Sequence, residues 1–139
     1  MGKLYAEQFG TSSTAQLPHV RAQAFIDRMD LAYSVADVVI CRAGASTISE
    51  LCLAGMAAIL VPSPNVAEDH QTQNAMALVN VGAAEMVTEA EAETHVVSSA
   101  LELITDRERC VNYRRQISAL AMPNAADEIV GEIISAAQA

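Results

Sequence analysis

The chain has 139 residues, of which 52% are hydrophobic, and a formal net charge of −9 at pH 7. This length fits one domain with a core of its own. The sequence contains no run of about 20 apolar residues, which a membrane-spanning helix would need. Only eight residues are Lys or Arg, which argues against nucleic-acid binding because that binding needs basic side chains at the phosphates. Three cysteines without a C-x-x-C pair indicate neither a disulfide framework nor a zinc site, and predict reduced thiols in a cytoplasm.

The beginning of the chain is expected to alternate between helix and strand. Residues 3–10 have the pattern of the end of a helix, and residues 11–18 that of a polar loop. Residues 20–25 alternate in the manner of a strand. The next apolar residues recur at helical spacing and predict a helix: Met29, Ala32, Tyr33 and Ala36.

The middle of the chain has the pattern of a parallel sheet. Three short apolar runs predict strands: residues 38–41, 58–61 and 84–87. The first run is short and apolar enough for a strand that is buried on both faces. Two helices are expected between the strands: residues 47–54, ended by Gly55, and residues 68–80, ended near Gly82. Because strands that alternate with helices pair in parallel through right-handed crossovers, the sequence predicts an α/β fold with a doubly wound parallel sheet.

The last part of the chain is expected to be helical. The acidic run at residues 89–93 is interpreted as a solvated helix start, which the helix dipole favours. One apolar face follows: Val97, Ala100, Leu101 and Ile104. A second apolar stripe comes after a break at residues 122–124: Ile129, Val130, Ile133 and Ile134.

The turn after the first of these three strands is a candidate ligand site. Residues 42–47 read Arg-Ala-Gly-Ala-Ser-Thr and have little side-chain bulk, so that a phosphate or a sugar hydroxyl could approach the backbone N–H groups of a helix start. The alternative is structural, because Thr47 and Glu50 also match a capping box, in which the carboxylate reaches back to its own helix end. Spacing alone favours the capping box, since such helix starts are common.

Parallel strands bring their C-terminal ends to one edge of the sheet, where ligands of such folds bind. Three segments are expected to meet there: residues 25–27, 42–50 and 62–74. The third segment contains Glu-Asp-His-Gln-Thr-Gln-Asn at residues 68–74. This is an unusually polar beginning for a helix.

In their order along the chain these motifs resemble the C-terminal, donor-binding half of the MurG family of bacterial glycosyltransferases. The residues that carry the resemblance are 25–29, 36–50, Gly55, 61–62 and 69–75, and it extends over most of the chain from about Val20 onward. The family moves N-acetylglucosamine from UDP-N-acetylglucosamine onto a lipid-linked muramyl-pentapeptide in peptidoglycan synthesis. The resemblance therefore implies a Rossmann-like domain of the GT-B architecture.

The resemblance also implies which residues bind the donor. Ile26 should offer backbone groups to the uracil edge, Glu50 should bind the ribose hydroxyls, and Gln71 should bind the hydroxyls of the sugar. Backbone N–H groups of one turn should face the sugar and the pyrophosphate: Gly44, Ala45, Ser46 and Thr47. Both side-chain roles suit the chemistry, since a carboxylate accepts from two vicinal hydroxyls and an amide both donates and accepts.

Three more residues are possible donor contacts. Arg42 could touch phosphate or be a salt-bridge partner, and His70 could be a donor-side contact or exposed polar surface. Asn74 could orient Gln71 from the same helix face. We assign no catalytic residue. We expect no metal and no cofactor either, because the chain lacks the Asp-x-Asp motif of metal-dependent glycosyltransferases, and the family's direct, inverting displacement can rely on helix dipoles.

Parts of the family's pattern are missing from this sequence. They are the N-terminal acceptor domain and the opening of the C-terminal domain, with its first strand and Gly-Gly-Ser phosphate loop. We therefore interpret residues 1–139 as a single, N-terminally truncated nucleotide-sugar-binding domain that lacks its first strands and turns over little without the acceptor domain. The lost strand should leave an unpaired sheet edge, which predicts a homodimer, a swapped arrangement or partial disorder before Phe25.

Two other functions stay open at this point. The chain could be a nucleotide-sugar-binding subunit that is active only with a separate membrane-associated partner. It could also be another GT-B enzyme, such as a UDP-sugar epimerase, although that reaction needs further acidic residues. The resemblance implies a cytoplasmic location, with the full protein peripheral at the inner face of the bacterial plasma membrane.

Overall fold

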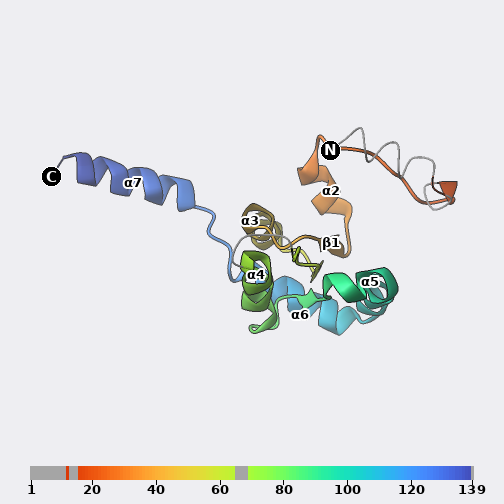
Figure 1. The fold of residues 1–139 in the computed structure, drawn as a ribbon. Coiled ribbons are helices and arrows are strands. Elements are labelled where there is room, and N and C mark those ends of the chain that lie inside the picture. Colours follow the sequence, from red (N-terminus) through yellow and green to blue (C-terminus); the bar gives the residue numbers. More distant parts are fainter. Residues whose placement is uncertain (1–11, 13–15, 65–68, 139) are drawn as a thin grey trace. The chain divides into compact units, whose positions relative to one another are not determined.

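The computed structural model describes residue 12, residues 16–64 and residues 69–138 (Figure 1). The chain divides into two compact units, Met1–Val35 and Ala36–Ala139. The helix end expected at residues 3–10 lies outside the described residues. So do residues 11 and 13–15 of the loop expected at 11–18.

The first unit contains the helix α2 (Met29–Val35), which confirms the helical spacing seen in the sequence. Arg28 pairs with Asp30 at its start, with an Nε to Oδ1 distance of 2.8 Å. The strand expected at residues 20–25 is wrong, because these residues are in no strand and all of them are exposed. A strand needs a neighbour to complete its ladder, and none lies beside these residues within the described part of the first unit.

The second unit is built on a sheet of three parallel strands in the order β1-β2-β3, and the parallel pairing confirms the predicted α/β pattern. The strands are β1 (Val39–Cys41), β2 (Ala58–Leu60) and β3 (Glu85–Met86). Each lies inside one of the three expected runs. Consecutive strands are therefore neighbours in the sheet, joined by helical crossovers.

Only the central strand is buried on both faces. Ala58, Ile59 and Leu60 of β2 are fully buried, whereas Ile40 in the middle of β1 is 45% exposed. The prediction that residues 38–41 are buried on both faces is therefore wrong. The reason is position, since β1 is an edge strand that pairs only with β2 within the described residues.

Five helices accompany the sheet within the described part of this unit: α3 (Ala45–Ala54), α4 (His70–Val79), α5 (Glu89–Thr105), α6 (Arg107–Ser118) and α7 (Ala125–Ala137). α3 begins two residues before the expected start at Thr47. The expected start of the next helix, Glu68, lies outside the described residues. The predicted break at residues 122–124 is confirmed, because α7 begins directly after it.

One face of the sheet is covered by α5 and α6. The buried cluster on this face consists of Ala57, Ile59, Val87 and Leu103, with Val96, Ala100, Cys110 and Tyr113 packed against it. The helix α5 therefore turns Leu103 to the sheet and leaves Val97 and Leu101 exposed at 65% and 60%. The apolar face predicted for this helix is real, but apart from Ala100 it is mostly exposed, because apolar residues line α5 on more than one side.

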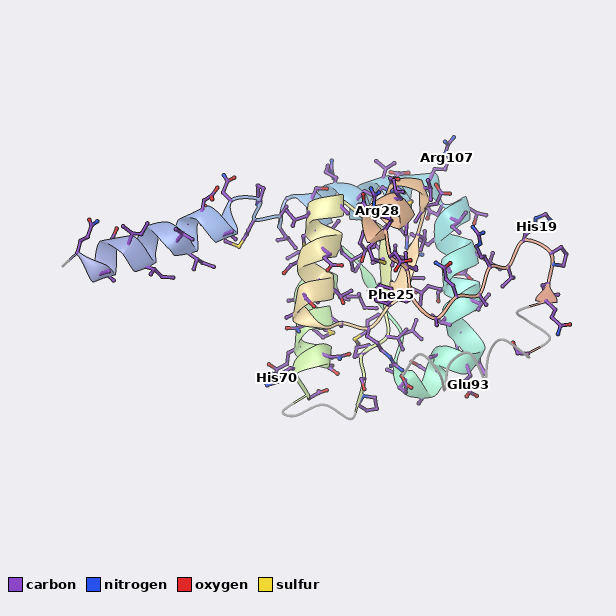
Figure 2. All side chains as sticks on the ribbon, turned by 90° about the horizontal axis from the view of Figure 1, so that it is seen from above. His19, Phe25, Arg28, His70, Glu93 and Arg107 are labelled. Carbon is purple, nitrogen blue, oxygen red and sulfur yellow. The ribbon has the colours of Figure 1, made fainter. Side chains whose placement is uncertain are left out.

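The helices α3 and α4 contact each other and contribute a second set of buried residues: Leu51, Cys52, Ala75 and Leu78. Side chains of successive strand residues alternate between faces, so Ala58 and Leu60 lie opposite Ile59. Figure 2 shows the labelled side chain of His70 at the start of α4. Both faces of β2 thus carry apolar packing.

The second apolar stripe of the sequence lies on α7, which has no buried residue. Its four branched side chains are 51–62% exposed: Ile129, Val130, Ile133 and Ile134. Within the described residues, no helix has the length and apolar character that crossing a membrane requires.

Gly55 ends α3 as predicted, and its conformation leads to a stability prediction. Its φ of 63° is left-handed, and a Cβ there would lie 2.6 Å from the Oγ atom of Ser118. Gly55→Ala is expected to lower the free energy of unfolding by about 1–2 kcal/mol, measured by denaturant titration, because a left-handed alanine is strained. Gly131→Ala on α7, where a Cβ meets nothing within 4 Å, is the control and should cost nothing. Equal effects of the two variants would contradict this explanation.

Candidate functional site

Two of the three polar segments expected at the C-terminal edge of the sheet do meet there. α4 is held to the turn after β1 by Asn74, whose Nδ2 donates to the carbonyl of Ala43 at 3.1 Å. It is held to the turn after β2 by Gln71, whose Oε1 accepts from the N–H of Ser63 at 2.9 Å. The third segment, residues 25–27, belongs to the other compact unit.

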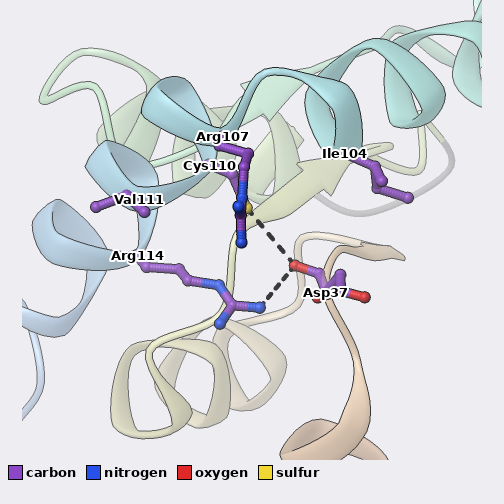
Figure 3. Close-up of a pocket in the computed structure, with 6 residues that line it drawn as sticks. All are labelled: Asp37, Ile104, Arg107, Cys110, Val111 and Arg114. Carbon is purple, nitrogen blue, oxygen red and sulfur yellow. Dashed lines mark hydrogen bonds between the residues drawn. The ribbon is translucent and has the colours of Figure 1, made fainter.

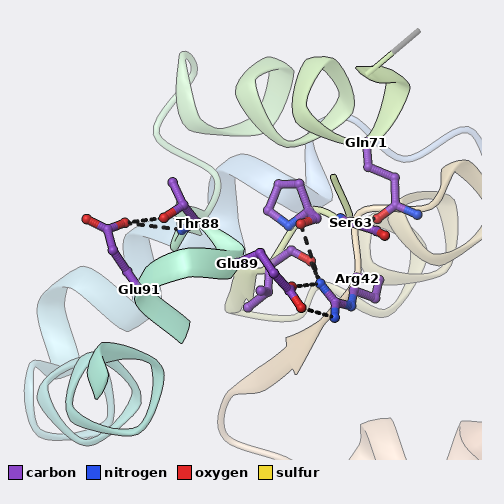
Figure 4. A network of polar contacts seen from close by, with 8 residues as sticks. Arg42, Ser63, Gln71, Thr88, Glu89 and Glu91 are labelled. Carbon is purple, nitrogen blue, oxygen red and sulfur yellow. Dashed lines mark hydrogen bonds and ion pairs between the residues drawn. The ribbon is translucent and has the colours of Figure 1, made fainter. Parts of the chain in front are cut away.

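The start of α3 has no side-chain cap. Gly44 is the N-cap residue, with extended φ and ψ of −68° and 148°, and the first helical hydrogen bond runs from the N–H of Ile48 to its carbonyl. The alternative of a capping box at Thr47 is therefore wrong, because the helix has already begun and Glu50 is its sixth residue. By contrast, α5 has a complete capping box formed by Thr88 and Glu91 (Figure 4).

Nothing that contacts Gly44 in the described structure requires a glycine there. Its φ is ordinary, and a Cβ would meet only the Oγ1 atom of Thr47, at 3.8 Å. The first N–H groups of a helix have no acceptor within the helix. At α3 those groups belong to Ala45, Ser46 and Thr47, and the missing side chain at position 44 leaves them approachable for an anion.

Gln71 is half-buried near the start of α4 and uses only half of its amide internally. Its Oε1 is bound to Ser63, and among the described residues its Nε2 donates to no acceptor. The hydrogen bond that orients Gln71 thus comes from Ser63 rather than from Asn74. His70, the first residue of α4, is exposed.

Arg42 is a salt-bridge partner, which is one of the two roles considered for it. Its NH1 and NH2 atoms both meet the carboxylate of Glu89, with an NH2 to Oε1 distance of 3.0 Å (Figure 4). The same NH1 donates to the carbonyls of Val61 at 3.2 Å and Pro62 at 3.4 Å. Hydrogen bonding within the pair lowers the pKa of Glu89 and raises the pKa of Arg42.

The two remaining residues that were predicted to contact the donor, Glu50 and Ile26, are accessible to solvent. Glu50 is exposed in the second turn of α3, so its carboxylate is not turned into the core. Ile26 is 38% exposed in the first compact unit. Analysis of the sequence missed Ser63 and Glu89. Ser63 lies between two prolines and Glu89 opens an acidic run, but neither pattern reveals a partner far along the chain.

A cavity of about 270 Å³ lies beside the beginning of β1, away from the turn after that strand (Figure 3). Arg114 donates from NH2 to the carbonyls of Ala36 and Asp37, and the Sγ of Cys110 contacts the second carbonyl at 3.8 Å. These contacts hold the backbone that leads into β1, so we interpret the cavity as structural. Within the described residues, no three His, Cys, Asp or Glu side chains are grouped to hold a metal ion.

A family model described as "Glycosyltransferase family 28 C-terminal domain" matches residues 1–129. A Parabacteroides distasonis protein is 57% identical over 110 residues, which are 79% of this chain and 30% of the relative. A Bacteroides fragilis protein is 47% identical over 139 residues, which are 99% of this chain and 37% of the relative. Both are named UDP-N-acetylglucosamine--N-acetylmuramyl-(pentapeptide) pyrophosphoryl-undecaprenol N-acetylglucosamine transferase. The chain thus spans about a third of the length of these curated relatives.

Solved structures agree with this comparison. The crystal structure of Acinetobacter baumannii MurG is similar with a TM-score of 0.76 at 35% identity, over 84% of this chain and 33% of that one. The glycotransferase of kitacinnamycin is similar with a TM-score of 0.64 at 22% identity, over 89% of this chain, a likeness that concerns the fold alone.

Proposed function

Because the chain belongs to the glycosyltransferase family 28 C-terminal domain family, we propose that it is the donor-binding part of an N-acetylglucosaminyltransferase of peptidoglycan synthesis. The donor would be UDP-N-acetylglucosamine and the acceptor a lipid-linked muramyl-pentapeptide, as in the names of the relatives. The observation that carries the proposal is the start of α3 at the end of β1, with no side-chain cap over its N–H groups. This is where folds with parallel strands bind phosphorylated ligands.

Each proposed contact matches the chemistry of one part of the donor. Backbone N–H groups of the turn would receive the pyrophosphate and the sugar: Gly44, Ala45, Ser46 and Thr47. Glu50 would accept from the ribose hydroxyls, and the Nε2 of Gln71 would donate to the sugar. With a net charge of −9, the protein relies on backbone dipoles to attract an anion.

The proposed reaction is a direct displacement at the anomeric carbon by an acceptor hydroxyl. The chain's contribution is to align the donor and to stabilise the negative charge that develops on UDP as it leaves. The groups that activate and bind the acceptor would come from outside residues 1–139. The proposed location is the cytoplasm, at the inner face of the plasma membrane.

Calorimetric titration of the full chain tests this proposal. UDP-N-acetylglucosamine is expected to bind more tightly than UDP-glucose, and UDP-glucose more tightly than ADP-glucose. A chelator should leave the affinity unchanged, because N–H groups rather than a metal ion hold the pyrophosphate. Binding of ADP-glucose as tight as that of UDP-N-acetylglucosamine would contradict the proposal.

We also propose that two copies of the chain associate through the edge of β1. Ile40 is 45% exposed there, and an open edge invites pairing with another chain. Light scattering should give the mass of two chains for the wild type and of one chain for Ile40→Lys, since a charged edge resists pairing. Leu53→Lys, an equally apolar exposed site on α3, should leave the dimer intact. A monomeric wild type would refute the pairing.

A further inference from the structure

We propose that Arg42, Glu89 and Ser63 are positioning residues that fix Gln71 so that it meets the donor sugar only as a hydrogen-bond donor. This inference rests on the proposed function and adds residues that touch no ligand themselves. We call these three residues, together with Gln71, the positioning network (Figure 4).

The first step concerns the amide of Gln71. Its Oε1 accepts from the N–H of Ser63 at 2.9 Å. An amide whose oxygen is bound in this way presents its NH2 group on the other side. The rotation that would exchange the two groups is opposed, because it would place two donors, Nε2 and the Ser63 N–H, against each other. Gln71 is therefore expected to recognise an acceptor oxygen on the sugar.

The second step concerns the peptide unit that joins Pro62 to Ser63. In a trans peptide the C=O and the N–H point in opposite directions. The carbonyl of Pro62 accepts from the NH1 of Arg42 at 3.4 Å, while the N–H of Ser63 donates to Gln71. The same peptide plane is thus held at both ends, and Arg42 sets the direction in which the N–H points.

The third step concerns Arg42 itself. A free arginine side chain has many rotamers, and holding it in one geometry costs conformational entropy. The carboxylate of Glu89, the first residue of α5, binds both terminal nitrogens of the guanidinium. Such a two-point pair fixes the plane of the guanidinium. The NH1 atom is then directed at the carbonyls of Val61 and Pro62.

The network makes a specific prediction about which variants act alike. Gln71→Glu keeps an oxygen for Ser63 but cannot donate to the sugar. Arg42→Lys keeps the charge but cannot bind the carboxylate at two points. Glu89→Gln keeps an oxygen but loses the charge and the second acceptor. Each variant should weaken binding of UDP-N-acetylglucosamine by about 5- to 10-fold, the effect of one lost hydrogen bond.

The test compares UDP-N-acetylglucosamine with UDP by calorimetry on the full chain. Affinity for UDP should change less than about twofold in all three variants, because Gln71 meets the sugar. The double variant Arg42→Lys with Gln71→Glu should be no weaker than Gln71→Glu alone, since both changes remove the same contact. Arg115→Lys, which alters an arginine paired with Asn112 on α6, is the matched control and should bind both ligands as the wild type does.

The outcomes separate the network from the function. Two outcomes in which the wild type binds both ligands would refute the network and leave the proposed function standing. In the first, the effects of Arg42→Lys and Gln71→Glu add up in the double variant. In the second, the variants lose as much affinity for UDP as for UDP-N-acetylglucosamine. If the wild type binds neither ligand, the proposed function is refuted and the network with it. Thermal unfolding of each variant shows whether a loss of binding comes from a loss of folding.

Discussion

Glu50→Ala is expected to weaken binding of UDP by about 10- to 100-fold, because hydrogen bonds to a charged group are worth about 1.5–3 kcal/mol. The carboxylate lies exposed in the second turn of α3, one turn beyond the N–H groups proposed for the pyrophosphate. It can accept from both ribose hydroxyls at once. Calorimetric titration with UDP measures the effect directly.

The ligand supplies the control for this prediction. With 2′-deoxyuridine diphosphate one of the two hydroxyls is absent, so the same substitution should cost clearly less. Glu102→Ala, which removes an exposed carboxylate from α5, should change neither affinity. An equal loss for UDP and its deoxy analogue would show that Glu50 acts through the charge of the site rather than through the ribose.

Gly44→Ser is expected to weaken binding of UDP by about 10- to 100-fold while the protein becomes no less stable. Serine is a better N-cap than glycine and has a less flexible unfolded state, and both effects favour the folded protein. The same hydroxyl would accept from the N–H of Ser46 or Thr47, the groups proposed for the pyrophosphate. In the variant, the serine hydroxyl would therefore occupy N–H groups that would otherwise bind the pyrophosphate.

Two measurements on each variant decide this point, the affinity for UDP and the free energy of unfolding. Gly55→Ala at the other end of α3 should show the reverse, with stability lost and affinity kept in the folded fraction, because its left-handed φ is a matter of backbone strain. Binding of UDP by Gly44→Ser as tight as by the wild type would rule out the start of α3 as the pyrophosphate site.

The parts of the fold that local signals determine could be predicted from the sequence. Gly55 and Gly82 both have positive φ at the ends of the helices they were expected to end. The runs around Ile59 and Met86 are strands as expected, because short apolar runs between helix signals leave few other conformations. The parallel order then follows from the alternation of strand and helix.

The parts that depend on distant neighbours could not be predicted. Ile40 has the sequence context of a buried strand, but its exposure is decided by the place of β1 at the edge of the described sheet. Residues 20–25 have the alternation of a strand, but no strand lies beside them within the described part of the first unit. α5 offers apolar residues on more than one side, and only the sheet selects Leu103 over Leu101.

The candidate site divides in the same way. The meeting of residues 42–50 with residues 62–74 could be predicted, because local sequence signals mark the ends of parallel strands and the starts of helices. The internal hydrogen bonds of the site could not, since Arg42 and Glu89 are 47 residues apart and meet only when α5 folds beside the turn after β2. The capping box at Thr47 failed for a local reason, because Gly44 allows the helix to begin earlier.

The stripe of branched side chains on α7 also bears on the colloidal behaviour of the protein. At pH 7 the net charge of −9 makes copies of the protein repel one another. Near the isoelectric point of about 4.6 that repulsion vanishes, while the four apolar side chains of α7 remain exposed to solvent. Acidification or added salt is therefore expected to make a concentrated solution turbid. A mildly alkaline buffer of low ionic strength should keep it clear.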